Sequence, residues 1–199
     1  MSPRPRKVTD KQLFAAAQAV MSKVGPHELT LATIAEEAGV TAAVLVQRFG
    51  SKRALLLASF KEAASGAGEI IASLAKQHIS PLAALRAYAN CVSGMAASPA
   101  AFARNLAYLQ IDLTDPDFRR LLVKQARATR AGLQRLVEAA AKAGELARNV
   151  RPVQLARTIE ATVSGSMLTW AFYQEGCAAK WIRTDLEAVL APYIQKSPK

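Results

Sequence analysis

The side chains able to perform catalysis or bind a metal are few and scattered in this 199-residue sequence. His27 lies in a Gly-Pro-His turn, and His78 stands alone near the end of a predicted helix. Cys91 and Cys177 form neither a Cys-x-x-Cys motif nor a metal-ligand pattern, so we expect two reduced thiols. A nucleophile elbow, a phosphate-binding glycine loop and a His-Glu-x-x-His motif are all missing from the sequence. We therefore predict no enzymatic activity, no catalytic residues, no metal and no cofactor.

A different kind of site is indicated by residues 31–50, LATIAEEAGVTAAVLVQRFG. Two short helices that cross closely require a small residue at the crossing, and Ala35 occupies that position. The tight turn between them requires a positive φ, which Gly39 adopts without a Cβ clash. The segment therefore predicts a helix-turn-helix whose second helix, over residues 41–49, is the recognition helix. Taken alone, the pattern also fits a helical hairpin that binds nothing.

Helical spacing assigns the side chains of this segment to an inner and an outer face. The predicted inner face contains Ile34, Ala38, Val40, Val44, Leu45 and Phe49. The predicted outer face of the recognition helix contains Ala42, Ala43, Val46 and Gln47.

The rest of the chain predicts an all-α protein of about nine helices, because no stretch alternates like a strand. Thr9 and Gln12 have capping-box spacing at the first helix, and Leu29-Thr30 begins the second. Ser80-Pro81, Ser98-Pro99 and Asp115-Pro116 each place an N-cap residue before a proline at the first helical position. The later helices are predicted over residues 81–97, 100–112, 117–143, 152–175 and 180–191.

The helix-turn-helix segment resembles the TetR family of bacterial transcriptional regulators. The family motif is matched by Thr30, Ile34, Ala35, Ala38, Gly39, Val40, Thr41, Leu45, Phe49, Ser51, Lys52 and Leu55. The resemblance implies a dimeric DNA-binding regulator, in most cases a repressor released from a palindromic operator by a small ligand. It also implies a helix-turn-helix domain over residues 9–55 and a ligand-binding and dimerisation domain over 56–199.

The resemblance also implies which residues contact DNA phosphates. Thr30 and Thr33 lie at a predicted helix N-terminus, where the helix dipole favours an anion, and Thr41 begins the recognition helix. Lys52 corresponds to a lysine that the family places on the DNA backbone. Each threonine is also explained as a simple N-cap, and Thr30 fits both roles.

The recognition helix departs from the family pattern at Ala42, Val46 and Arg48. The family usually has a lysine or polar residue at the first position and an aromatic residue at the other two. We therefore expect Gln47 to contact an adenine edge or a phosphate, and Ala42, Ala43 and Val46 to lie against thymine methyl groups. Arg48 is expected either to reach a phosphate or to pair with an acidic residue of its own domain.

The formal net charge of +11 favours binding to a polyanion. Genome composition also explains such a charge, and an architectural protein that binds DNA by charge alone remains the alternative function. Residues 1–8 are predicted to be a flexible basic arm. Arg4 and Arg6 in it either enter a minor groove or belong to an idle tail.

The resemblance also implies that the helix over residues 152–175 forms the homodimer interface. The alternative is a packing helix within one subunit. A pocket for an unidentified small-molecule effector is expected among the middle helices. Its candidate lining residues, each of which also fits a plain core position, are Tyr88, Cys91, Met95, Phe102, Tyr108 and Trp170.

The sequence contains no apolar run near the roughly 20 residues that span a bilayer. The basic start lacks the apolar stretch of a signal peptide. We therefore expect a cytoplasmic protein without a membrane partner.

Overall fold

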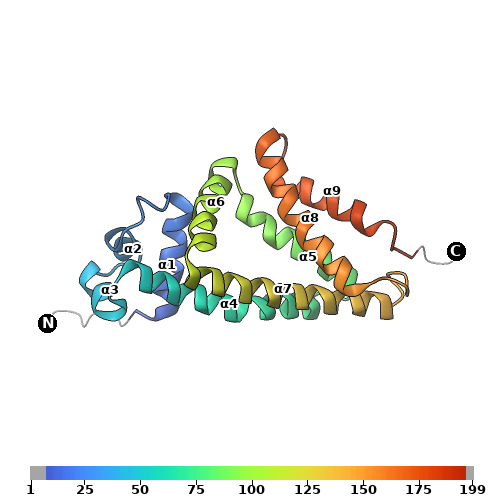
Figure 1. The fold of residues 1–199 in the computed structure, drawn as a ribbon, viewed down its shortest axis with the longest axis horizontal. Helices are drawn as coiled ribbons and strands as arrows, with labels where there is room; N and C mark the ends of the chain where they lie inside the picture. The colour runs from blue at the N-terminus through green and yellow to red at the C-terminus, as the bar shows by residue number, and fades with distance from the viewer. Residues whose placement is uncertain (1–7, 196–199) are drawn as a thin grey trace. The chain divides into compact units, whose positions relative to one another are not determined.

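The computed structural model describes residues 8–195, and every regular element in that range is helical (Figure 1). The arm residues Arg4 and Arg6 lie outside the described residues. The all-α prediction is confirmed, with nine α-helices among the described residues. Their bounds are α1 Asp10–Lys23, α2 Leu31–Glu37, α3 Ala42–Phe49, α4 Lys52–Gln77, α5 Pro81–Ser93, α6 Pro99–Thr114, α7 Pro116–Lys142, α8 Pro152–Tyr173 and α9 Ala178–Leu190, with a 3-10 turn at Gly94–Ala96.

Capping hydrogen bonds confirm the predicted helix starts after Thr9, Ser80 and Asp115. Thr9 and Gln12 form a reciprocal capping box at α1. The Ser80 hydroxyl accepts a hydrogen bond from the Ala83 amide (3.1 Å), as the N-cap of α5. The Asp115 carboxylate accepts one from the Asp117 amide (2.9 Å) at the start of α7. These bonds satisfy amides that have no partner inside their own helices.

The chain divides into two compact units. The first contains the residues up to Ala63 together with Ala103–Leu121, and the second contains Ala64–Phe102 with Leu122 onward. Helices α1, α2 and α3 thus share their unit with most of α6 and the start of α7. Each unit is built around its own hydrophobic cluster.

In the first unit, α1 packs on α2 and α2 packs on α3. Leu13, Ile34 and Leu45 are fully buried in its core, as the helical spacing predicts. The prediction for Val44 is wrong, because 39% of that side chain is exposed. Helix α3 docks through Leu45 and Phe49, one turn apart, and Val44 is rotated from Leu45 by about 100° around the helix.

In the second unit, α9 packs against both α8 and α5. The core residues of α8 recur at helical spacing: Leu155, Ile159, Val163, Met167 and Trp170. Helix α7 passes so close to α4 that a Cβ on Gly132 would lie 2.9 Å from the Ile71 Cδ1. Among the helices of residues 8–195, none has both the length and the apolar content that crossing a membrane demands.

Candidate nucleic-acid interface

Helix α3 presents an outer face of small and apolar side chains with one amide. Thr41, Ala43, Val46 and Gln47 are all exposed, and Val46 is 49% exposed. Ala42, predicted on the same face, is partly buried and packs against the core of the first unit. The Gln47 amide offers both a donor and an acceptor, which is the combination that an adenine edge requires.

Two glycines and one aromatic pair hold α3 in place. Gly39 in the turn before α3 has φ of 66°, as the sequence predicts, and Gly50 after it has φ of 80°. Both values lie in the left-handed region that side chains with a Cβ rarely adopt. At the end of α3, the Phe49 ring lies 5.9 Å from the Phe14 ring of α1. The outer face therefore belongs to a helix that is fixed to the core of the first unit through Ala42, Leu45 and Phe49.

The threonines at α2 have a structural role as caps. The Thr30 hydroxyl accepts a hydrogen bond from the Thr33 amide (3.1 Å), and the Thr33 hydroxyl accepts one from the Thr30 amide (3.0 Å). The Thr33 hydroxyl also donates to the Thr30 carbonyl (2.9 Å). By contrast, Thr41 makes no capping hydrogen bond through its side chain. Of the three, Thr41 has the hydroxyl least committed to its own helix.

The two cationic candidates are both held by groups of the first unit. The Lys52 ammonium donates to the carbonyl of Leu29 (2.7 Å). The Arg48 guanidinium pairs with Asp10, with 2.6 Å between Nε and Oδ1, and donates to the Val8 carbonyl (2.7 Å). Of the two roles expected for Arg48, the structure therefore contains the second, an ion pair with an acidic residue of its own domain.

Comparison with family models identifies both parts of the chain. Residues 13–59 match the model described as bacterial regulatory proteins of the tetR family. Residues 82–195, more than half of the chain, match the model described as the BetI-type transcriptional repressor, C-terminal. The chain belongs to the TetR family. It is therefore a transcription regulator with a DNA-binding helix-turn-helix, which contains α2 and α3.

Solved structures of TetR-family proteins share this fold. Reduced NemR of E. coli has a TM-score of 0.75 at 18% identity, over 96% of this chain and 100% of that one. FadR of Bacillus subtilis, solved with stearoyl-CoA, has a TM-score of 0.70 at 18% identity, over 92% of this chain and 98% of that one. SmeT, the repressor of a Stenotrophomonas maltophilia multidrug efflux pump, has a TM-score of 0.68 at 21% identity, over 96% of this chain and 93% of that one. Comparison with curated protein sequences found no significant match.

Among the described residues, the six candidate ligand residues are divided between the two hydrophobic clusters and the surface. Phe102 and Trp170 are buried in the core of the second unit, and Tyr88 packs against that core. Burial raises the pKa of the Tyr88 hydroxyl to about 12. Cys91 and Met95 are exposed.

Tyr108 belongs to the core of the first unit, where its hydroxyl donates to the Val24 carbonyl (3.1 Å). Periodicity marks an aromatic residue as buried, but it does not reveal which of two cores the residue joins.

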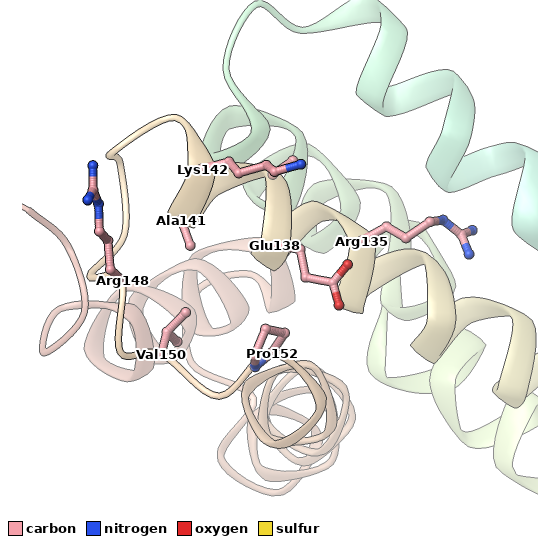
Figure 2. A pocket seen from close by; sticks show the side chains of 8 residues that line it. Arg135, Glu138, Ala141, Lys142, Arg148, Val150 and Pro152 are labelled. Carbon is pink, nitrogen blue, oxygen red and sulfur yellow. The ribbon is translucent and has the colours of Figure 1, made fainter.

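A surface hollow of about 700 Å³ lies in the second unit, between the end of α7 and the start of α8 (Figure 2). Its basic side chains are Arg135, Lys142 and Arg148, whose charged ends point in different directions (Figure 2). Glu138 lies among them and adds a negative charge. None of the six candidate ligand residues lines this hollow.

Helix α8 has an exposed face beside its buried one, and this exposed face was not predicted from the sequence. Ala161, Gly165, Leu168 and Phe172 are exposed at intervals of three or four residues, with Leu168 at 39% and Phe172 at 72%. Side chains at such intervals share one side of a helix. The spacing of Ala161, Gly165, Leu168 and Phe172 in the sequence is the signal that indicates this face.

Proposed function

We propose that this TetR-family protein is a homodimeric repressor that binds a palindromic operator through α3 and is released by a small molecule. The observation that carries the proposal is the outer face of α3, where Thr41, Ala43, Val46 and Gln47 are exposed on an anchored helix. An anchored helix with exposed side chains can enter the major groove without first rearranging.

Gln47 is the principal base reader in this proposal. It contacts an adenine edge, while Ala42, Ala43 and Val46 lie against thymine methyl groups. Thr30, Thr33, Thr41, Arg48 and Lys52 contact phosphates at the ends of α2, α3 and α4. Because only one side chain of the outer face forms strong hydrogen bonds, DNA shape supplies part of the specificity.

The exposed face of α8 supports dimerisation. Small residues at Ala161 and Gly165 let a second helix approach closely, and Leu168 and Phe172 lose their water contact in such a pair. A two-fold dimer places two copies of α3 about one DNA turn apart on a palindrome. We expect the dimer to act in the cytoplasm, where it has access to the chromosome.

The larger unit is the proposed sensor of the effector. Support comes from FadR of Bacillus subtilis, a structural neighbour solved in complex with stearoyl-CoA. Tyr88, Cys91, Met95, Phe102 and Trp170 of the larger unit remain the proposed candidate contacts, together with Tyr108, which lies in the first unit. An effector that weakens DNA binding must itself bind more weakly to the DNA-bound protein, by the same factor.

A DNA-binding titration tests the proposal. Fluorescence anisotropy would compare the intergenic DNA beside the protein's own gene with scrambled DNA, at several salt concentrations. We expect two chains per operator and a preference of at least ~1000-fold for the native segment. Equal binding to both DNAs, lost steeply with salt, would contradict the proposal and favour the architectural alternative.

The variant Gln47→Ala tests the reader assignment, with Gln18→Ala on the exposed side of α1 as the matched control. We expect Gln47→Ala to reduce discrimination at one base pair of each half-site by about 1–3 kcal/mol. Gln18→Ala leaves the ranking of operator variants unchanged. An unchanged ranking with Gln47→Ala would show that Gln47 does not read a base.

A further inference from the structure

A cavity of about 160 Å³ lies within the first unit. It is lined by residues of α1, α4, α6 and the start of α7, and by the loop before α2. The lining is mostly apolar, with Leu29, Leu56 and Phe60 among its members. An apolar cavity of about 150 Å³ in another protein is large enough to bind benzene. The size of this cavity therefore suits a compact ligand of a few heavy atoms.

One carboxylate in this lining has no counter-charge. Asp112 of α6 is only 8% exposed, and none of the hydrogen bonds or ion pairs among the described residues involves its side chain. Burial, followed by repulsion from Asp115, raises the pKa of the Asp112 carboxyl to about 6. Pairing with a cation lowers the free energy of a buried, ionised carboxylate more than that of an exposed one.

The cations of the protein that line the same cavity are already engaged. The Lys52 ammonium is bound to the carbonyl of Leu29 (2.7 Å). Arg53 forms ion pairs with Asp115 (2.9 Å) and Asp117 (2.7 Å). Within residues 8–195, no ion pair gives Asp112 a charged partner.

The aromatic members of the lining suit an organic cation. Phe60 and Tyr108 both line the cavity, and an aromatic face attracts an ammonium group. The face of Phe118 is occupied by Arg53, whose guanidinium carbon lies 5.8 Å from the ring centre. Phe60 and Tyr108 are therefore the rings that a ligand would contact.

We propose that this cavity binds a small organic ammonium ion, whose charge pairs with Asp112 while its alkyl part contacts the apolar side chains, Phe60 and Tyr108. The site lies in the unit that contains the helix-turn-helix, and it shares only Tyr108 with the candidate contacts of the effector. Leu29, directly before the N-cap of α2, is part of its wall.

Calorimetric titration of the full-length protein tests the proposal. The probes are n-propylammonium and tetramethylammonium chloride, with 1-propanol as the neutral counterpart and sodium chloride to match ionic strength. We expect one saturable site per chain for at least one ammonium ion and weaker binding of 1-propanol. Absence of saturable binding by both ammonium ions would overturn the proposal, as would equal affinity for 1-propanol.

Two variants locate the site. Asp112→Asn keeps the shape and removes the charge, and we expect it to weaken ammonium binding at least ~10-fold, since a neutral amide cannot form the ion pair. Phe60→Leu keeps an apolar wall and removes the ring, with an expected loss of a few fold. Glu62→Gln, an exposed carboxylate on α4, is the control and should bind as the wild type does. Unchanged affinity in Asp112→Asn would overturn the assignment.

The pH dependence provides a second readout that does not need a variant. The titratable groups lining the cavity besides Asp112 are Lys52, Arg53, Tyr108 and Asp115. Ammonium binding should weaken as the pH falls below about 6, where Asp112 takes up a proton. Affinity that is constant from pH 7 to pH 5 would contradict the ion pair. These measurements use no DNA, so their failure is independent of any failure of the proposed operator binding.

Discussion

Arg48 of α3 and Asp10 of α1 form an ion pair, with 2.6 Å between Nε and Oδ1. The pair joins the end of the recognition helix to the start of the first helix. Both side chains are substantially exposed, at 38% and 53%, and pairs of this kind contribute about 0–1 kcal/mol to stability. Arg48 can therefore exchange Asp10 for a DNA phosphate at small cost.

The variant Asp10→Asn should strengthen DNA binding several-fold at low salt, for operator and scrambled DNA alike. The reason is that Arg48 loses its internal partner and the first unit loses one negative charge. Anisotropy titrations at two salt concentrations measure the effect. Glu175→Gln, an exposed carboxylate of the second unit, controls for net charge. An equal gain in both variants would argue against a phosphate contact by Arg48.

Gly39→Ala should destabilise the protein by about 1–2 kcal/mol, because φ at this position is 66° and an L-residue is strained there. A Cβ at Gly39 would meet no atom within 4 Å, so the cost comes from the backbone alone. Urea denaturation measures it. Gly25→Ala, also in open space but without a positive φ, is the control and should be neutral or slightly stabilising. Equal stability of the two variants would refute the backbone argument.

Gly132→Ala should destabilise the second unit by about 1–3 kcal/mol through overpacking, since the new Cβ would lie 2.9 Å from the Ile71 Cδ1. Gly66→Ala in α4 is the matched control, because its Cβ would lie in open space. In a helix interior that change gains up to about 1 kcal/mol. The midpoint of thermal unfolding, followed by circular dichroism, should therefore fall in Gly132→Ala and rise in Gly66→Ala.

Asp112→Asn should stabilise the protein above pH 6 by up to about 3 kcal/mol, since one pKa unit corresponds to about 1.4 kcal/mol. The folded-state pKa of about 6 lies above the ordinary value of 3.8, so the folded protein binds this proton more tightly than the unfolded chain does. The wild type is stabilised by Asp112 protonation below pH 4, and it loses that contribution as the pH rises to 6. The advantage of the variant should therefore shrink between pH 6 and pH 4.

Asp115→Asn should change the free energy of unfolding in the opposite direction to Asp112→Asn, when both variants are measured by urea denaturation at several pH values. Desolvation raises the pKa of the Asp115 carboxyl, but hydrogen bonds from Arg53 and from the Asp117 and Phe118 amides outweigh it and lower the pKa overall. The charged form is thus stabilised in the folded protein, and the variant should be less stable than the wild type at neutral pH. Stabilisation by both variants would show that the two carboxyls do not differ in this way.

Local interactions were predictable from the sequence because they depend on residues three or four positions apart. The capping box of α1, the positive φ of Gly39 and the burial of Ile34 and Leu45 are of this kind. The family motif likewise spans one continuous segment. Even so, Val44 shows the limit of this reasoning. On a helix of only eight residues, spacing does not decide where the buried face ends.

Contacts between distant parts of the chain were decided by tertiary structure alone. Arg48 meets Asp10, and Tyr108 joins the core of the first unit through Val24, although 84 residues separate the two in sequence. The cavity around Asp112 arises because α6 packs beside α1 and α4, and only that packing buries most of the Asp112 side chain. Periodicity reports how a side chain is oriented on its own helix. The groups that it meets depend on how the helices pack, and that is a property of the whole chain.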